Sequence, residues 1–502
     1  MDASQQHTRL VVAGLLLGIF MAAIDNTIVA TALGSIVSDL GGLDQFVWVT
    51  SAYMVTVLAG MPIFGKLSDM YGRKRFFIIG LIIFLAGSAL CGVAQNITQL
   101  SIFRAVQGIG GGALLPIAFT IVFDIFPPEK RGKMTGLLGA VFGSASVFGP
   151  LIGAYLTEYI SWHWVFYVNI PIGLLSVILV GKFYHEKAKL ESQKIDWAGA
   201  LTLVAGVVSL MFALELGGKE FSWTSWQFFS LFGSFVLFLI LFLVAEIKAK
   251  DPIISFWMFK SRLFASSQIL AFLYGASFII LTIFIPIFVQ AVYGGSATSA
   301  GYILMPLMLG SVVGSGLAGA FMTKTSYRSI MFVSITSFIA GMGLLSTMTP
   351  DTGRLLLTLF MILSGFGVGF SFSLLPNASI HNLDPRFRGS ANATNAFFRS
   401  LGMTIGVTIF GAIQTKIFTR ELENAGSAGS GFDMSNPQGI FQPEVRGQIP
   451  ARVLEPVINA MSDSITAMFL FALIPLGAAL ITVFFMGKTR LNIEKKEAAS
   501  AK

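Results

Sequence analysis

Asp25 is an acidic residue within a long apolar run, where a charged side chain is unfavourable unless it has a partner or a function. It lies about fifteen residues into the apolar run Leu10–Leu33, far from water at either end. Inside hydrocarbon an ionisable group is costly unless it is paired, lines a cavity or exchanges a proton. Because desolvation favours the neutral acid, Asp25 suits a site that binds and releases a proton. The alternative is a structural carboxylate satisfied by nearby hydroxyls such as that of Thr27.

Arg104 is a second charge of this kind, near the start of the apolar run Leu100–Phe123. It is able to pair with Asp25 and so tie the protonation of that acid to the conformation of the protein. Alternatively, the guanidinium bonds backbone carbonyls and its stem reaches water at the membrane surface. The sequence leaves both alternatives open.

A glycine-rich and charged segment follows the second apolar run, and it reads Gly65-Lys-Leu-Ser-Asp69-Met-Tyr-Gly72-Arg73-Lys-Arg75. The two glycines permit tight turns, and Asp69 can accept from backbone N–H groups at a helix end. Arg73 can bridge to Asp124 at the end of the fourth run. A basic loop that only sets the orientation of the protein in the membrane does not require an acidic residue such as Asp69. We therefore predict a latch that forms and breaks as the protein works.

The fifth apolar run, Met134–Thr157, carries glycines around a proline. Small residues let two helices approach closely, and proline removes one helical hydrogen bond. A hinge or a tight seam is predicted, and ordinary close packing is the alternative. The residues concerned are Gly136, Gly149, Pro150 and Gly153.

Composition identifies the solvent around these residues. Of the 502 residues, 55% are hydrophobic and 12% are charged, whereas soluble proteins carry about 25% charged residues. A lipid bilayer is the natural solvent for such a chain. The single cysteine, Cys91, excludes intrachain disulfides and cysteine metal clusters. We interpret the first apolar run as a spanning helix and not as a cleaved signal peptide.

We predict an all-α protein with fourteen spanning helices, each of about 20 apolar residues. Residues 1–190 are expected to form an N-terminal six-helix bundle, 191–262 an inserted helix pair, and 263–502 a C-terminal six-helix bundle with a long external loop at 415–464. The predicted spans are Leu10–Leu33, Val47–Lys66, Phe76–Ala94, Leu100–Phe123, Met134–Thr157, Trp164–Val180, Trp197–Leu216, Phe228–Ala245, Ser266–Gln290, Ala297–Met322, Ser329–Met348, Leu355–Asn377, Ala391–Gln414 and Ile465–Met486.

The basic residues fix the orientation of these helices. Of the 33 lysines and arginines, the ones that face outward under this division are Lys219, Arg354, Lys416, Arg420, Arg446 and Arg452. Such an excess of basic residues on one side marks the cytoplasmic side, and an even helix count leaves both termini there. The net charge of +8 is then an orientation signal and not a nucleic-acid footprint. Arg399 is expected to extend its side chain to the cytoplasmic surface.

An internal repeat relates the two bundles. Residues 128–132 (Pro-Glu-Lys-Arg-Gly) recur as 385–389 (Pro-Arg-Phe-Arg-Gly), 257 positions later, and residues 65–75 loosely resemble 319–329. Repeated halves are common in secondary transporters. The intramembrane charges break the symmetry, because Met361 takes the place equivalent to Arg104. We therefore expect ion coupling in the N-terminal half.

These segments together resemble the major facilitator superfamily, and within it the fourteen-helix drug:proton antiporter branch (EmrB/QacA type). Residues 65–75 look like its loop 2–3 signature, and Arg104-Ala-Val-Gln-Gly-Ile-Gly110 looks like its helix 4 motif. The glycines around Pro150 look like the helix 5 motif of exporters, although Ala145 and Ala154 stand where glycine is typical. Residues 25–30 resemble the helix 1 motif, and 162–173 the helix 6 entrance with His163 in place of arginine.

The resemblance implies a proton-coupled antiporter that exports hydrophobic drugs or related amphiphiles across a bacterial cell membrane, as a monomer and without cofactor or metal. The substrate cavity should lie between the halves at the bilayer midplane. Apolar, adaptable side chains suit such a cavity. Our candidates for its lining are Tyr53, Met54, Phe142, Phe278, Met305, Met308, Phe370 and Phe398.

Alternative functions remain. The same fold would serve a proton-coupled exporter of a lipid or metabolite, or a proton symporter. An enzyme or ATP-driven pump is disfavoured, because the segment ending Gly487-Lys488-Thr489 has Thr482 where a phosphate loop needs glycine. A channel is disfavoured because no charged ring or filter-like loop stands out.

Overall fold

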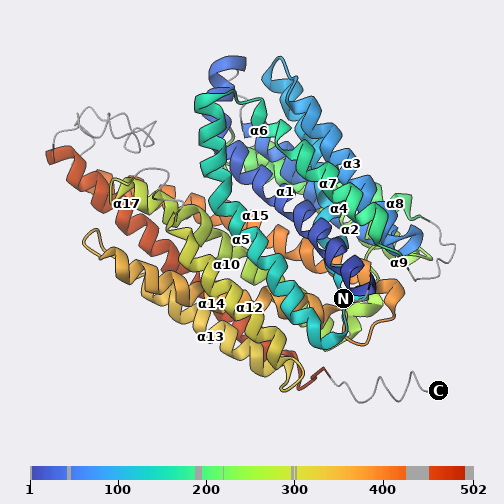
Figure 1. The fold of residues 1–502 in the computed structure, drawn as a ribbon. Helices are drawn as coiled ribbons and strands as arrows, with labels where there is room; N and C mark the ends of the chain where they lie inside the picture. The colour runs from blue at the N-terminus through green and yellow to red at the C-terminus, as the bar shows by residue number, and fades with distance from the viewer. Residues whose placement is uncertain are drawn as a thin grey trace.

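A computed structural model describes residues 3–41, 47–186, 195–218, 220–295, 299, 302–424 and 451–491. These residues form an all-helical bundle with no strand among them, only two isolated bridges. Thirteen described stretches are long and apolar enough to cross a membrane. One further long helix, α5 (Pro128–Tyr159), spans 32 residues, so the architecture agrees with the fourteen helices predicted. Helix α1 (Ala3–Leu40) begins and the last helix, α18 (Leu473–Phe485), ends toward the same end of the bundle (Figure 1).

The N-terminal half begins with long helices separated by short turns. Gly72, between the second and third helices, has a φ of 108°, a backbone conformation that favours glycine. Asn96 begins α4 by accepting a hydrogen bond from the backbone of Gln99 at 2.9 Å. Besides α5, the helices are α1 (Ala3–Leu40), α2 (Val47–Tyr71), α3 (Arg73–Cys91), α4 (Ile97–Ile125), α6 (Trp164–Tyr167) and α7 (Asn169–Phe183).

The pair of helices predicted to be inserted corresponds to α8 (Trp197–Leu216) and α9 (Trp226–Lys248), followed by the short helix η1 (Phe256–Lys260). Helix α9 is the most apolar of the spanning stretches, and only 6% of its most apolar window is buried within the protein. A helix that is hydrophobic all round and so little covered faces lipid. The pair therefore lies at the edge of the bundle.

The C-terminal half contains the remaining helices. They are α10 (Arg262–Ala291), α12 (Leu304–Phe321), α13 (Tyr327–Leu345), α14 (Arg354–Ser379), η2 (Pro385–Phe387), α15 (Arg388–Asn424), α17 (Ala451–Phe471) and α18 (Leu473–Phe485). The predicted external loop 415–464 is too long at both ends. Helix α15 continues to Asn424, and α17 already begins at Ala451. Helices are not obliged to end at the bilayer surface, and residues 425–450 lie outside the described part of the chain.

Three hydrophobic clusters show how the helices are grouped. The largest is formed by side chains between Leu263 and Met486, and two others by side chains between Val11 and Tyr184. A fourth cluster joins α2 and the inserted pair to the segment around Ile253 and to Phe397 of α15. The inserted pair thus packs on the N-terminal half and also contacts the other half.

The internal repeat appears in the packing of α4 and α14. A Cβ atom on Gly108 would meet the backbone of Tyr53 in α2, and one on Gly110 would meet the backbone of Phe84 in α3. At the equivalent places, Gly365 meets the backbone of α12 and Gly367 meets that of α13. Small residues at helix interfaces in membranes allow backbones to approach this closely. Each half therefore holds one glycine-lined helix between two neighbours.

This packing generates a prediction for Gly110. We expect Gly110→Leu to lower the free energy of unfolding by about 2 kcal/mol, because overpacking costs roughly 1–3 kcal/mol and backbone atoms cannot move aside cheaply. The measurement is the melting temperature of the detergent-purified protein. Gly343→Leu is the matched control, since nothing lies within 4 Å of its Cβ position. Equal losses in the two variants would contradict the close-packing account.

Candidate functional site

Asp25 and Arg104 form an ion pair buried in the N-terminal half. Oδ2 of Asp25 lies 2.5 Å from Nη1 of Arg104, with the carboxylate side chain 0% and the guanidinium side chain 1% exposed. The structure thus brings together the two charges that the sequence allowed to pair. Arg104 also donates from Nε to the carbonyl of Val49 at 3.2 Å. The idea that its stem reaches water is wrong, because packing on every side covers it.

Neutral side chains complete the shell of Asp25. Its Oδ1 accepts from Nε2 of Gln107 at 2.8 Å and from Nδ2 of Asn169 at 2.9 Å. Gln107 in turn accepts from Arg104 at 2.7 Å, and Ser88 of α3 contacts Asn169 at 3.0 Å. Asp25 is therefore bonded to two helices besides its own, α4 and α7, and α3 joins through Asn169.

Gln107 and Asn169 are residues of this site that the sequence analysis did not identify as partners of Asp25. A signal was present for Gln107, because a residue three positions after Arg104 lies on the same helix face. No pattern places Asn169 of α7 beside α1. The predicted alternative partner of Asp25, the Thr27 hydroxyl, is wrong. Thr27 donates to the carbonyls of Ile24 at 3.0 Å and Ala145 at 3.1 Å.

Aromatic rings close the site on the side of the guanidinium. The guanidinium carbon of Arg104 lies 4.1 Å from the centroid of Tyr53 and 5.9 Å from that of Phe166. Cation–π contacts gain strength when the cation is desolvated. The oxygen Oδ1 of Asn169 has no hydrogen-bond partner, so the shell of the pair holds one unsatisfied buried acceptor. The arrangement keeps the ion pair away from water, and water can reach the two charges only if the surrounding helices move.

Helix α5 contacts the acidic helix through the predicted glycine seam. A Cβ atom on Gly149 would overlap Oγ1 of Thr27, and one on Gly153 would overlap Oγ1 of Thr31. Pro150 lies inside α5 between these glycines. Nearer the start of α5, a Cβ atom on Gly136 would lie 3.4 Å from Oγ of Ser315 in α12. The glycine face of α5 thus packs against α1 toward one end of the helix and against α12 of the C-terminal half toward the other.

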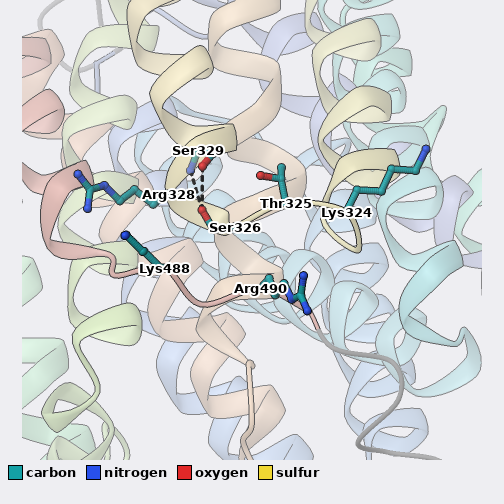
Figure 2. Close-up of a pocket in the computed structure, with 7 residues that line it drawn as sticks. All are labelled: Lys324, Thr325, Ser326, Arg328, Ser329, Lys488 and Arg490. Carbon is teal, nitrogen blue, oxygen red and sulfur yellow. Dashed lines mark hydrogen bonds between the residues drawn. The ribbon is translucent and has the colours of Figure 1, made fainter.

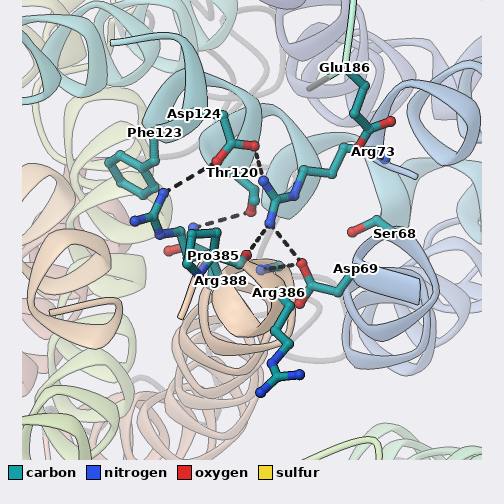
Figure 3. A network of polar contacts seen from close by, with 12 residues as sticks. Ser68, Asp69, Arg73, Thr120, Phe123, Asp124, Glu186, Pro385, Arg386 and Arg388 are labelled. Atoms are coloured by element: carbon teal, nitrogen blue, oxygen red, sulfur yellow. Dashed lines mark hydrogen bonds and ion pairs between the residues drawn. The ribbon is translucent and has the colours of Figure 1, made fainter. Parts of the chain in front are cut away.

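Arg73 joins the N-terminal helices to the segment at the start of α15 (Figure 3). It forms ion pairs with Asp69, at 3.0 Å, and with Asp124. It also donates to the carbonyl of Pro385 in the C-terminal half. From that half, Arg388 reaches Asp124 at 3.4 Å. The contact between Arg73 and Asp124 expected from the sequence is present, within a larger network.

Asp69 extends the network to the first turn of α15 (Figure 3). Its two oxygens accept from the backbone N–H groups of Gly389 at 2.9 Å and Ser390 at 2.7 Å. A carboxylate at a helix N-terminus satisfies free donors and meets the positive end of the helix dipole. Gly65 permits this approach, because its Cβ position would overlap Ala393 and lie 2.9 Å from the carbonyl of Gly389.

The repeat provides a second crossing between the halves. Gly132 of α5 meets Gly319 in α12 so closely that a Cβ on either would overlap the other's backbone. By the sequence repeat, Gly132 corresponds to Gly389 and Gly319 to Gly65. The carboxylate has no counterpart there, because Thr323 takes the place of Asp69. One crossing is therefore charged and the other is held by backbone contact.

Further hydrogen bonds join the halves near these crossings. Asn392 donates to Oγ1 of Thr120 at 3.2 Å, and the hydroxyls of Thr135 and Ser373 lie 2.8 Å apart. In the ribbon, the halves meet toward the end where α1 begins and α18 ends, and they diverge toward the other end (Figure 1). This conformation is closed at the end of the bundle that the basic residues predict to be cytoplasmic.

The predicted cavity residues fall into different environments. Tyr53 and Phe370 are core residues, 3% and 4% exposed, so neither offers a free surface in this conformation. Phe278 packs edge-on against Phe372, with centroids 5.5 Å apart, and Met54 is 48% exposed. The side chain of Phe142 lies outside the described part of the structure. The partly buried members of the set are Phe278, Met305, Met308 and Phe398.

Arg399 does not extend to the cytoplasmic surface, contrary to the prediction. Its two Nη atoms donate to the hydroxyl and the carbonyl of Ser371, each at 3.1 Å. The guanidinium carbon lies 4.6 Å from the centroid of Phe372. Bonding to α14 satisfies the cation inside the protein, so its stem has no need to reach water.

The fold and these sites define a multi-pass membrane transporter, and the family comparison names its class. The Major Facilitator Superfamily model matches residues 15–407, and the chain belongs to that superfamily. It is 64% identical to Multidrug resistance protein 3 of Bacillus subtilis (strain 168), covering 98% of this chain and 97% of that one. It is 34% identical to the Multidrug transporter protein MdtP of the same organism, covering 99% and 96%.

Solved structures share the fold at low sequence identity. The proton:xylose symporter XylE is 13% identical with a TM-score of 0.63, covering 99% of both chains. The human organic anion transporter MFSD10 is also 13% identical, with a TM-score of 0.60, covering 95% of this chain and 100% of that one. These similarities show the architecture alone.

The buried pair generates a prediction for stability. Asp25→Asn leaves the guanidinium of Arg104 without its counter-charge, and breaking a buried pair in this way costs about 3–5 kcal/mol. We expect a clear fall in the melting temperature of the purified protein. The double variant Asp25→Asn/Arg104→Gln should recover most of that loss, because no uncompensated charge remains. Additive losses would show that the two residues do not act as a pair.

The charged crossing generates a prediction for opening. We expect Asp69→Asn to raise the maleimide-labelling rate of a Ser373→Cys reporter about tenfold, because hydrogen bonds to a charged group contribute roughly 1.5–3 kcal/mol. Ser373 is 0% exposed in the closed seam, and the background is Cys91→Ser. The control is Asp384→Asn, an acid half-exposed on the same face. An unchanged rate in Asp69→Asn would remove Asp69 from the latch.

Proposed function

We propose that this protein is a proton-coupled antiporter that exports hydrophobic drugs or related amphiphiles from the cytoplasm of a bacterial cell. The observation that carries the proposal is the fully buried Asp25–Arg104 pair, which no bulk water reaches in the closed conformation. Intramembrane ionisable residues are a mark of proton pathways in transporters. The protein needs a bilayer, protons and a small hydrophobic substrate, and we propose that it acts as a monomer.

The proposed coupling begins with the charge on Asp25. When Asp25 takes up a proton, Arg104 loses its counter-charge but keeps its bonds to Gln107 and Val49. The shell of donors around Asp25 then favours a different arrangement, since hydrogen bonds to a carboxylate are stronger than those to a neutral acid. Protonation thereby changes how tightly α1 is bound to α4 and α7.

Helix α5 is the proposed route from this pair to the cytoplasmic seam. Thr27, two residues after Asp25, bonds the carbonyl of Ala145 in α5 at 3.1 Å. The same helix meets α12 where Gly132 faces Gly319. A packed helix transmits displacement along its length, because protein interiors are close to incompressible. Movement of α1 would therefore shift the crossing that closes the cytoplasmic side.

Relatives support the choice of substrate class. The two Bacillus relatives carry names that refer to multidrug resistance and multidrug transport, and a relative at 32% identity is named an efflux pump. The sequence offers no carboxylate in α10 or in Ala297–Met322 that would select doubly charged cations. Neutral or singly charged amphiphiles fit such a site. One charge moved through 100 mV contributes about 2.3 kcal/mol, so a membrane potential assists an electrogenic exchange.

The test is drug-driven proton movement in proteoliposomes that contain the purified protein. We expect hydrophobic drugs to drive protons in the opposite direction through the wild type, and Asp25→Asn to lose at least nine-tenths of that flux. Asp39→Asn is the matched control on the same helix. Its oxygen accepts from Nε1 of Trp162 at 2.8 Å, a bond that asparagine can still accept, so flux should persist.

Different outcomes separate the proposal from its alternatives. Proton and drug moving in the same direction would replace antiport by symport. No drug response, with proton-linked flux of a lipid or metabolite, would move the substrate class. Full flux in Asp25→Asn would overturn the coupling role of Asp25, provided that the variant binds drug as the wild type does.

A further inference from the structure

A hollow rich in positive charge lies at the cytoplasmic side of the C-terminal half (Figure 2). It is formed where the turn between α12 and α13 meets the segment that follows α18. Four of its lining residues are cationic and three carry a hydroxyl. The lining residues are Lys324, Thr325, Ser326, Arg328, Ser329, Lys488 and Arg490.

Backbone bonds hold the two sides of this hollow together. The N–H of Tyr327 donates to the carbonyl of Thr489 at 3.0 Å, and the N–H of Leu491 donates to that of Met322 at 3.3 Å. Gly487, with a φ of 74°, turns the chain back after α18 in a conformation that favours glycine. Segments about 160 residues apart are thus joined at a defined register, so the cations are brought together by the fold.

The clustering of four cations around one hollow is not required for setting the orientation of the protein in the membrane. Lysines and arginines that set orientation need only lie on the cytoplasmic side, and like charges around one hollow repel each other. The equivalent loop of the N-terminal half has Asp69 to pair with its arginine. Here Thr323 takes that place, and no acidic residue is among those that line the hollow.

The hydroxyls and the helix end suit an oxyanion. Ser326 caps α13 by accepting from the backbone of Ser329 at 3.2 Å, and the two hydroxyls lie 2.9 Å apart. The first N–H groups of α13 at Tyr327 and Ser329 are already bonded within the protein, so the helix end would act on an anion through its dipole. Arginine and lysine together supply charge-assisted hydrogen bonds to the same kind of group.

We propose that this hollow binds a phosphate group, and that the group belongs to an anionic phospholipid of the cytoplasmic leaflet. The guanidinium of Arg328 lies 4.9 Å from the ring centroid of Phe484. The ring centroids of Phe484 and Phe332 lie 6.1 Å apart. Phe484 of α18 is 50% exposed and Phe332 of α13 is 44% exposed. A headgroup held by the cations therefore has an apolar surface beside it for its acyl chains, which free phosphate would leave unused.

The site is independent of the proposed transport role. A bound headgroup would neutralise the repulsion among the cations and join the α12–α13 turn to the segment after α18. Basic pockets between helices on the cytoplasmic side recognise anionic headgroups by the same chemistry. We expect the bound lipid to raise the melting temperature of the protein.

The test measures binding of single lipids to the full-length protein in detergent, by native mass spectrometry and by thermal melting. Phosphatidylglycerol should bind and stabilise, whereas phosphatidylcholine should not. Lys324→Gln/Lys488→Gln should weaken phosphatidylglycerol binding roughly thirtyfold, since each basic residue near an anionic surface contributes about a factor of five. Lys324→Arg/Lys488→Arg should retain binding, which shows that charge and not fold was lost.

Lys248→Gln/Lys250→Gln is the matched control. It removes two charges that are exposed at the cytoplasmic end of α9, away from the hollow, and should change binding less than twofold. Equal losses in both glutamine pairs would overturn the site. Wild-type protein that binds the two lipids equally would do the same. Stabilisation by inorganic phosphate at the level seen with lipid would overturn the phospholipid assignment.

Discussion

The absence of water in a bilayer core is the constraint on which this structure depends. A charge placed there must find its partners within the protein, and Asp25 shows the full consequence. Three side-chain donors from two other helices converge on its carboxylate. Any movement that separates α1 from α4 must first replace those bonds. The pair therefore fixes the relative positions of helices that otherwise pack through small residues.

The two halves share their helix packing but differ in their buried charged residues. Glycines place α4 and α14 between their neighbours in the same way. The buried ion pair has no equivalent among the described residues of the C-terminal half, where Met361 is fully buried in the place of Arg104. Arg399 is an intramembrane cation of that half, and its described partners are a serine and an aromatic ring. The shared packing gives the fold, and the unshared charges give each half its own chemistry.

Much of the fold could be predicted from the sequence, because a run of about 20 apolar residues has few alternatives to a spanning helix. The charges of Asp25 and Arg104 could be found because hydrocarbon makes them conspicuous, and Arg73 because it lies in a charged segment between two glycines and the next apolar run. Asn169 could not be assigned to Asp25, since a neutral amide gives no such signal, and Gln107 offered only its helical spacing from Arg104. Helix ends beyond the bilayer, such as Asn424, also escaped prediction because hydropathy does not report them. The division into two bundles and an inserted pair stays a prediction.

The two glycine crossings between the halves have different physical characters. At Gly65 and Gly389 the backbones are joined through Asp69 and Arg73, so the attraction there depends on charge, and burial of both side chains leaves it little screened by salt. At Gly132 and Gly319 two backbones touch, and that contact is indifferent to ionic strength. When the seam separates, the first crossing can come apart while the second still touches. The halves would then rotate about an off-centre pivot near α5, giving an entrance wider on the side of α2 and α15.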